Sequence, residues 1–146
     1  MMVIMSILIF PAFLMPVSSA VSEEKKPPPQ TWRIYDKTYN HVWNALVRVL
    51  IEDWKYALRA ADPNEGYLAT WAKTQPQENQ GAPQKRISIN VDVKKATGGT
   101  LVTVSCIIEE NNQNQNGRKK RWVTVPSDHL CESALLDAVG NKLGGK

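Results

Sequence analysis

The strongest helical pattern lies in the first half of the chain. Apolar side chains recur there every three or four residues, at Trp43, Leu46, Val47, Leu50, Ile51 and Trp54. This spacing lines them up along one side of an α-helix and leaves polar residues on the other side. Asp36 or Thr38 can accept a hydrogen bond from a free amide at the helix start. The sequence therefore predicts a helix at about 37–54, and a short strand can precede it at 32–35.

Two strands are predicted directly after this helix, at 56–61 and 66–73. The residues between them are Asp62-Pro63-Asn64-Glu65-Gly66. Proline, glycine and short polar side chains favour turns, so we expect the chain to reverse here.

The next two strands show the most regular alternation in the chain. Apolar and polar residues alternate through 87–93 and again through 101–110, as is typical of strands with one buried face. Thr97-Gly98-Gly99 lies between them and can adopt the backbone angles of a tight turn. The polar stretches 75–84 and 111–116 are predicted to be solvated loops.

A second helix is predicted at the end of the chain. Pro126-Ser127-Asp128 can begin it with an N-cap, and Gly144-Gly145 can end it. Its apolar side consists of Leu135, Leu136, Val139 and Leu143.

The element order (β)-α-β-β-β-β-α predicts the fold class. An α+β fold with an antiparallel sheet of four to five strands, and both helices packed on one face, buries both apolar helix sides at once. The polar residues Ser88, Asn90 and Asp92 are then expected on the open face of the sheet.

The first 20 residues differ in composition from the rest. Fifteen of them are apolar, and all four Met and both Phe of the chain fall within the first 15. The apolar run is short and interrupted by proline, and small residues at Ser18 and Ala20 fit a signal-peptidase site. No Lys or Arg precedes the run, so an upstream start or an uncleaved anchor stays an alternative. We predict a signal peptide at 1–20, a Pro-rich and charged linker at 21–30 and one α+β domain at 31–146.

The two cysteines, Cys106 and Cys131, suit an exported protein. Export implies an oxidising compartment, in which two cysteines can form one disulfide. The bridge would close a loop of about 25 residues and contribute roughly 3 to 4 kcal/mol in the chain-entropy model. Two buried thiols are the alternative.

Positive charge gathers near the end of the last loop, in a chain with a net charge of +4. The cluster consists of Arg118, Lys119, Lys120 and Arg121, next to Trp122. In an exported protein, anionic lipid headgroups or peptidoglycan are better partners for this cluster than nucleic acid. Exposed Trp71, Trp122 and Tyr67 could add a stacking platform for sugars. The alternative is that the four charges only solvate a loop.

The sequence offers little for catalysis. A nucleophile elbow, a phosphate-binding loop, a two-histidine zinc motif and a Cys-x-x-Cys pair are all absent from it. His41 suits a structural role, and His129 with Cys131 supplies only half of a zinc site. Glu109 and Glu110 are neighbours in a strand and so point to opposite faces. We therefore expect no enzyme activity, no cofactor and no metal site.

One part of the chain resembles the domain of BamC-like accessory lipoproteins of the bacterial outer membrane. The likeness follows the element order over about 31–143 and is specific over 35–72. The residues that carry it are Tyr35-Asp36-Lys37-Thr38-Tyr39-Asn40-His41-Val42-Trp43-Asn44-Ala45-Leu46, Leu50, Trp54-Lys55-Tyr56 and Glu65-Gly66-Tyr67-Leu68. The resemblance implies a small helix-on-sheet domain that works in the envelope through protein contacts, without catalysis. In this chain no Cys stands directly after the apolar run, at 18–22, to carry a lipid, which puts anchoring in the outer membrane in doubt.

Together these observations predict an exported, non-catalytic interaction or accessory module of a bacterial envelope. We expect it to be periplasmic or associated with the outer membrane, with another envelope protein as its partner. The alternative is a periplasmic glycan- or anion-binding module that uses the basic cluster at 118–121 and exposed Trp and Tyr side chains. The length of 146 residues and its composition exclude a polytopic membrane protein, a collagen-like chain and a large multidomain enzyme.

Overall fold

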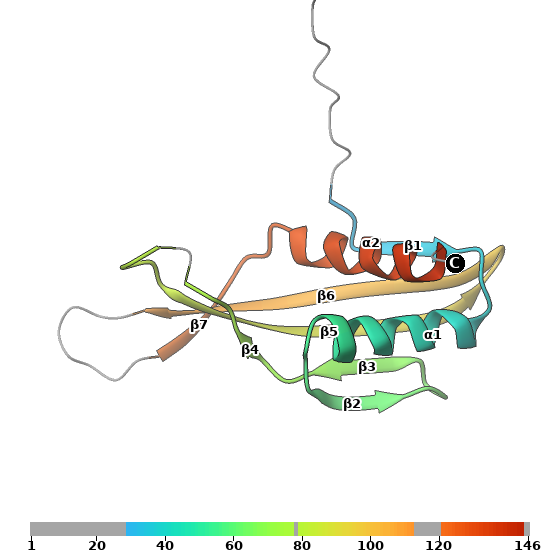
Figure 1. Ribbon diagram of the computed structural model, residues 1–146, viewed down its shortest axis with the longest axis horizontal. Coiled ribbons are helices and arrows are strands. Elements are labelled where there is room, and N and C mark those ends of the chain that lie inside the picture. The colour runs from blue at the N-terminus through green and yellow to red at the C-terminus, as the bar shows by residue number, and fades with distance from the viewer. Residues whose placement is uncertain (1–28, 78, 113–120, 145–146) are drawn as a thin grey trace, which may run out of the picture.

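The computed structural model describes residues 29–77, 79–112 and 121–144, and these form an α+β fold. One antiparallel sheet has the strand order β1-β6-β5-β3-β2, with β4 added beside β5 and β7 beside β6 (Figure 1). The strands are β1 (Trp32–Tyr35), β2 (Leu58–Asp62), β3 (Tyr67–Thr70), β4 (Lys73–Thr74), β5 (Gln84–Ala96), β6 (Gly99–Asn112) and β7 (Arg121–Val125). The predicted fold class is confirmed, and the sheet of seven strands includes β4 and β7 as additions to the expected order.

The first helical segment follows the predicted apolar stripe. It consists of α1 (Tyr39–Arg48) and a π-helical turn, η1 (Val49–Asp53). Thr38 stands at the N-cap, but its side chain makes no capping bond; its Oγ lies 3.0 Å from His41 Nδ1 instead. Lys55 then takes a left-handed φ of 58°, which turns the chain out of the helix toward β2.

The second helix, α2 (Leu130–Gly144), begins close to the predicted residues. The carboxylate of Asp128 accepts a hydrogen bond from the Leu130 amide, the first of the helix, at 3.0 Å, and His129, with a φ of 62°, is the residue directly before the helix. Within the described residues, no helix combines the length and the apolar character needed to cross a bilayer.

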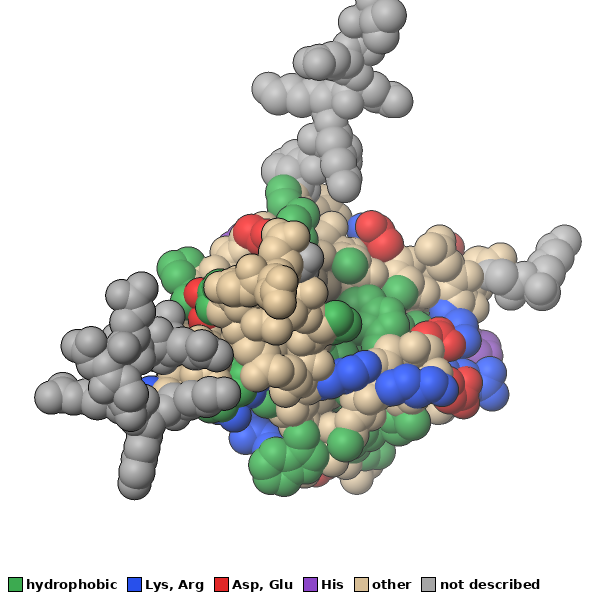
Figure 2. All heavy atoms as spheres, turned by 60° about the vertical axis from the view of Figure 1, so that its left-hand side comes forward, with side chains coloured by type: hydrophobic (Ala, Val, Ile, Leu, Met, Phe, Trp, Pro, Cys, Tyr) green, Lys and Arg blue, Asp and Glu red, His purple; other side chains and the backbone are tan. Residues whose placement is uncertain are grey.

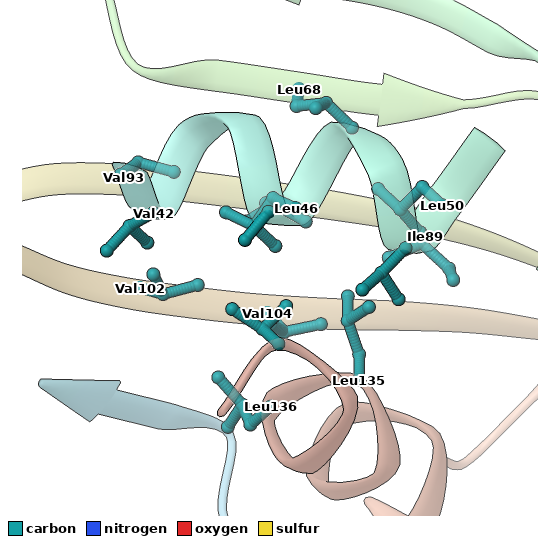
Figure 3. Packing of buried hydrophobic residues seen from close by; sticks show 14 of the residues in the cluster. Val42, Leu46, Leu50, Leu68, Ile89, Val93, Val102, Val104, Leu135 and Leu136 are labelled. Atoms are coloured by element: carbon teal, nitrogen blue, oxygen red, sulfur yellow. The ribbon is translucent and has the colours of Figure 1, made fainter. Parts of the chain in front are cut away.

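Both helices pack on the same face of the sheet. In Figure 3, Leu46 of α1 and Leu135 and Leu136 of α2 point toward the same part of β5 and β6. The strand residues that meet them alternate with outward-facing neighbours, and the register pairs Ile89 with Cys106, Val91 with Val104 and Val93 with Val102. The regular alternation of the predicted hairpin therefore marks its buried face correctly.

A glycine at the β2–β3 turn is required by the packing. Gly66 has a φ of +71°, and its carbonyl accepts a hydrogen bond from the Val93 amide at 2.7 Å. A Cβ atom at Gly66 would lie 2.0 Å from the Val93 carbonyl oxygen. The turn can thus approach β5 closely only because a side chain is absent.

The prediction of a loop at 111–116 is wrong at its start. Asn111 and Asn112 continue β6 and pair with Trp122 and Arg121 of β7. Residues 113–116 lie outside the described part of the chain. Asn is uncommon in strands, so the sequence provides no reason to expect one here. The pairing with β7 provides hydrogen-bond partners for the backbone groups of this segment.

Candidate functional site

One end of the sheet projects beyond both helices (Figure 1). We call this end the arm; it consists of β4, β7 and the paired segments 84–87 of β5 and 108–112 of β6. Neither of the two described helices covers the arm, and it carries the described part of the predicted anion site.

Trp122 is fixed on the arm by a charged pair. Its ring lies under the Arg86 guanidinium, whose Cζ is 4.4 Å from the ring centroid. Arg86 donates two hydrogen bonds to the Glu109 carboxylate, at 2.7 and 3.0 Å, and these bonds hold the pKa of Glu109 below its usual value. One face of Trp122 is therefore already occupied by a cation. Only its other face could stack on a sugar.

The predicted basic cluster is described only in part. Arg118, Lys119 and Lys120 lie outside the described residues. Arg121, at the start of β7, is exposed, whereas Trp122 is half-buried. Elsewhere on the arm, Arg86 pairs with Glu109 and Lys85 lies 3.7 Å from Glu110, whereas Lys73 of β4 donates to the Trp54 carbonyl at 2.6 Å. The described part of the arm thus carries a small positive excess, from Arg121 and Lys73.

A second surface is the open face of the sheet, opposite the helices. In β1, Arg33 pairs with Asp137 of α2 at 2.8 Å and the Tyr35 hydroxyl donates to the Leu136 carbonyl at 2.6 Å. Because strand side chains alternate, Trp32 and Ile34 must point the other way. They are 58% and 45% exposed.

Other apolar side chains share this open face. Trp32 pairs with Thr103 and Ile34 with Leu101 of β6. Ile107, further along β6 and on the same face, is 38% exposed. Figure 2 turns the left-hand side of Figure 1, where the arm lies, toward the viewer and shows hydrophobic side chains interspersed with polar and charged ones there. On the open face, the register makes Trp32, Ile34 and Leu101 neighbours, while Ile107 lies farther along β6. The predicted polar residues Ser88, Asn90 and Asp92 alternate in register with the buried positions of β5, as expected.

A cleft of about 1230 Å³ lies at the opposite end of the sheet from the arm. It is bounded by the start of α1, the β2–β3 turn and the β5–β6 turn, and its lining includes Lys37, Lys94 and Lys95 as well as Asp36 and Glu65. Charges of both signs line this cleft, so it has no single electrostatic preference.

Local bonds hold the polar groups of the cleft. The Tyr39 hydroxyl donates to the Pro63 carbonyl at 2.7 Å, and desolvation raises the pKa of this tyrosine. His41 lies against Thr38. The Tyr39 bond connects α1 to the β2–β3 turn, whereas the His41 contact is local to the start of α1.

The two cysteines are brought together as the sequence predicts. Cys106 on β6 and Cys131 in the first turn of α2 have their Sγ atoms 2.07 Å apart, at disulfide-bond distance, with a Cα–Cα distance of 6.3 Å. The bond joins α2 to the buried face of the sheet, which is the face expected to hold Cys106.

A buried glutamate beside this disulfide was not predicted. Glu132 is only 2% exposed, and one of its carboxylate oxygens accepts a hydrogen bond from the Cys106 amide at 3.2 Å. The Ser127 hydroxyl donates to the same carboxylate, at 3.1 and 3.2 Å to its two oxygens, and His129 Nδ1 lies 3.4 Å from it. A glutamate in the first turn of a helix ordinarily faces water, so no sequence signal distinguishes this one.

Glu132 of α2 is buried because it lies against the edge of β6, at a point where no described strand pairs with that edge. On this edge of β6, β1 pairs as far as Thr103, the Val104 amide bonds the Thr31 carbonyl, and β7 begins to pair at Ile108. The Cys106 amide falls in the gap between these two partners. The Glu132 carboxylate supplies the acceptor that a strand would otherwise provide, so the ladder continues across the gap.

Comparison with known proteins adds no assignment, because neither a protein-family model nor a curated protein matches this chain. The geometry thus defines a helix-on-sheet domain with an uncovered arm, an open face with exposed apolar residues, and a cysteine–glutamate–histidine cluster at the start of α2.

Proposed function

We propose that this protein is an exported, non-catalytic interaction module of a bacterial envelope, and that it contacts another envelope protein through the open face of its sheet. The observation that carries this proposal is the exposure of Trp32, Ile34 and Ile107 on the side of the sheet that no described helix covers. Apolar side chains that adjoin one another on an exposed surface, as Trp32, Ile34 and Leu101 do, mark protein-binding sites.

Two further observations support the envelope part of the proposal. The pairing of Cys106 with Cys131, the two cysteines of the sequence, is what an exported protein would be expected to have. The apolar leader at 1–20, with small residues at Ser18 and Ala20, suits export. The resemblance of 35–72 to BamC-like domains points in the same direction.

The test is site-specific photocrosslinking in intact cells. A photoreactive residue at Ile34 on the open face is compared with one at Ile51, which is equally apolar and similarly exposed (45% and 42%) but lies in η1 on the helix layer. We expect an envelope protein to be captured from position 34 and not from position 51. Equal capture from both positions, or recovery of the protein in the cytoplasm with residues 1–20 intact, would contradict the proposal.

A glycan- or anion-binding role is the second candidate, favoured by the exposed Arg121 beside Trp122 at the start of β7. It predicts that the protein sediments with purified peptidoglycan or with anionic vesicles, and that Arg121→Ala together with Trp122→Ala abolishes this. An interaction module of the open face should remain in the supernatant in both assays.

A further inference from the structure

The cluster at the start of α2 contains more potential metal ligands than a structural disulfide needs. The Sγ atoms of Cys106 and Cys131 and a carboxylate oxygen of Glu132 all lie within 4.8 Å of one another. His129 adds a ring nitrogen, Nδ1, at 3.4 Å from Glu132 Oε1. Two sulfurs, one carboxylate and one imidazole thus come together from β6 and from three closely spaced positions around the first turn of α2.

We propose that the reduced protein binds one Zn²⁺ at this cluster, with Cys106 Sγ, Cys131 Sγ, a Glu132 carboxylate oxygen and His129 Nδ1 as ligands. The redox state of the two cysteines then controls metal binding, because the disulfide form has no thiolate ligands and the reduced form has two.

The spacing of the donors fits a tetrahedral zinc site. Nitrogen and oxygen ligands at about 2.0–2.1 Å from zinc are about 3.4 Å apart along a tetrahedral edge, and His129 Nδ1 and Glu132 Oε1 already have this separation. Two thiolates at about 2.3 Å from zinc need to be about 3.8 Å apart. Once the bridge is reduced, its two sulfurs are free to move apart to that distance.

The type of donor indicates the metal. Thiolate sulfur and imidazole together favour zinc over magnesium or calcium, which prefer oxygen ligands. Two thiolates and one carboxylate balance the charge of Zn²⁺ with one negative charge in excess, and the neutral imidazole completes four ligands.

Neighbouring groups would hold these ligands in place. The Cys106 amide donates to Glu132 Oε1, and the Ser127 hydroxyl lies within hydrogen-bond distance of both carboxylate oxygens. Because each carboxylate oxygen has two lone pairs, Oε1 can keep the bond from Cys106 and still bind a metal beside His129. Such supporting bonds are typical of metal sites. The His129 side chain is 53% exposed, so a metal ion can reach the cluster from solvent on this side.

The redox step is an ordinary thiol–disulfide exchange with a protein dithiol as reductant. One thiolate of the dithiol attacks a sulfur of the bridge, and its second thiolate resolves the mixed disulfide. Two electrons pass to the bridge, so that two cysteine thiols and one oxidised dithiol result. Binding of Zn²⁺ to the two cysteines then releases their thiol protons to water. The proposal does not depend on the partner or on the open face of the sheet.

The test uses the purified protein with and without reduction by a phosphine that is removed under anaerobic conditions. Each form is titrated with Co²⁺ alone as a spectroscopic substitute for zinc, and then with Zn²⁺. We expect the reduced form to bind one equivalent of Co²⁺, with tetrahedral visible bands and a thiolate-to-cobalt charge-transfer band that Zn²⁺ removes, and the oxidised form to show neither. Absence of the charge-transfer band in the reduced protein would overturn the proposal.

Variants identify the other ligands. His129→Ala and Glu132→Gln should each weaken Co²⁺ binding at least tenfold, whereas His41→Ala, which changes a histidine outside the cluster, should leave it unchanged. Unchanged affinity in His129→Ala would overturn the proposed ligand set. Circular dichroism monitors folding throughout. Loss of the native signal on reduction that one equivalent of Zn²⁺ fails to restore would also count against the site.

Discussion

The buried carboxylate of Glu132 allows a quantitative test of the gap in the sheet edge. In Glu132→Ala, the Cys106 amide loses its acceptor while remaining buried against α2. An unsatisfied buried donor costs about 1–3 kcal/mol. The Ser127 hydroxyl also loses its partner, but burial of a charged carboxylate is relieved, so these two effects partly cancel. We expect the free energy of unfolding to fall by about 2 kcal/mol, or the melting temperature by about 8 °C.

The assay is urea unfolding followed by circular dichroism, under conditions that keep the cysteines oxidised. Glu132→Gln retains a carbonyl oxygen for the Cys106 amide and should lose less than half as much stability as Glu132→Ala. Glu52→Ala removes an exposed glutamate of η1 and serves as the control, with an expected change within about 0.5 kcal/mol. If the Gln and Ala variants are equally destabilised, or if the Ala variant matches the wild type, the acceptor role of Glu132 is refuted.

Three further predictions follow from the contacts described above. Replacing Cys106 and Cys131 by serine should lower the free energy of unfolding by about 3.5 kcal/mol in metal-free solution, because the unfolded chain loses its cross-link; an unchanged denaturation midpoint would contradict this. Gly66→Ala should prevent folding or destabilise the folded state severely, because its Cβ would collide with the Val93 carbonyl oxygen. In Gly98→Ala the Cβ would meet open space, so only the positive φ of +85° is unfavourable, at a cost of about 1 kcal/mol. Thermal melting of the two variants separates steric collision from backbone strain. Burial raises the pKa of Tyr35 to about 12, so this tyrosine ionises at lower pH in the unfolded chain than in the folded protein. The free energy of unfolding should therefore fall between pH 10 and 12 by up to about 1.4 kcal/mol per pH unit. Ultraviolet titration of tyrosinate in Tyr35→Phe and in the wild type checks this, and identical titration curves would refute it.

The sequence predicted those elements in which the pattern of apolar and polar residues follows the burial of one side. The α1 stripe and the alternation in β5 and β6 reflect burial on one side, which constrains residue type at every second or third position. The close approach of Cys106 and Cys131 was predictable for the same reason, because each occupied the expected buried side of its own element.

The features that the sequence did not predict, β7 and the burial of Glu132, have no such pattern of apolar and polar residues. β7 has little burial on either face, so its residues show no clear alternation that would predict its pairing with Asn111 and Asn112. Glu132 is buried where it fills the gap between β1 and β7 along the edge of β6, and none of its neighbours in sequence indicates that gap. The cluster around it could be recognised only after the fold had brought β6 and α2 together.

The edge of β6 that receives β1, Glu132 and β7 has a consequence for the timing of folding. β1 emerges first during synthesis, but its partner residues on β6 follow some 70 residues later, and the apolar side of α2 emerges last. Contacts between segments so distant in sequence close late and slow the folding reaction. The growing chain therefore cannot complete its core until α2 has left the ribosome, and until then it should remain accessible to chaperones.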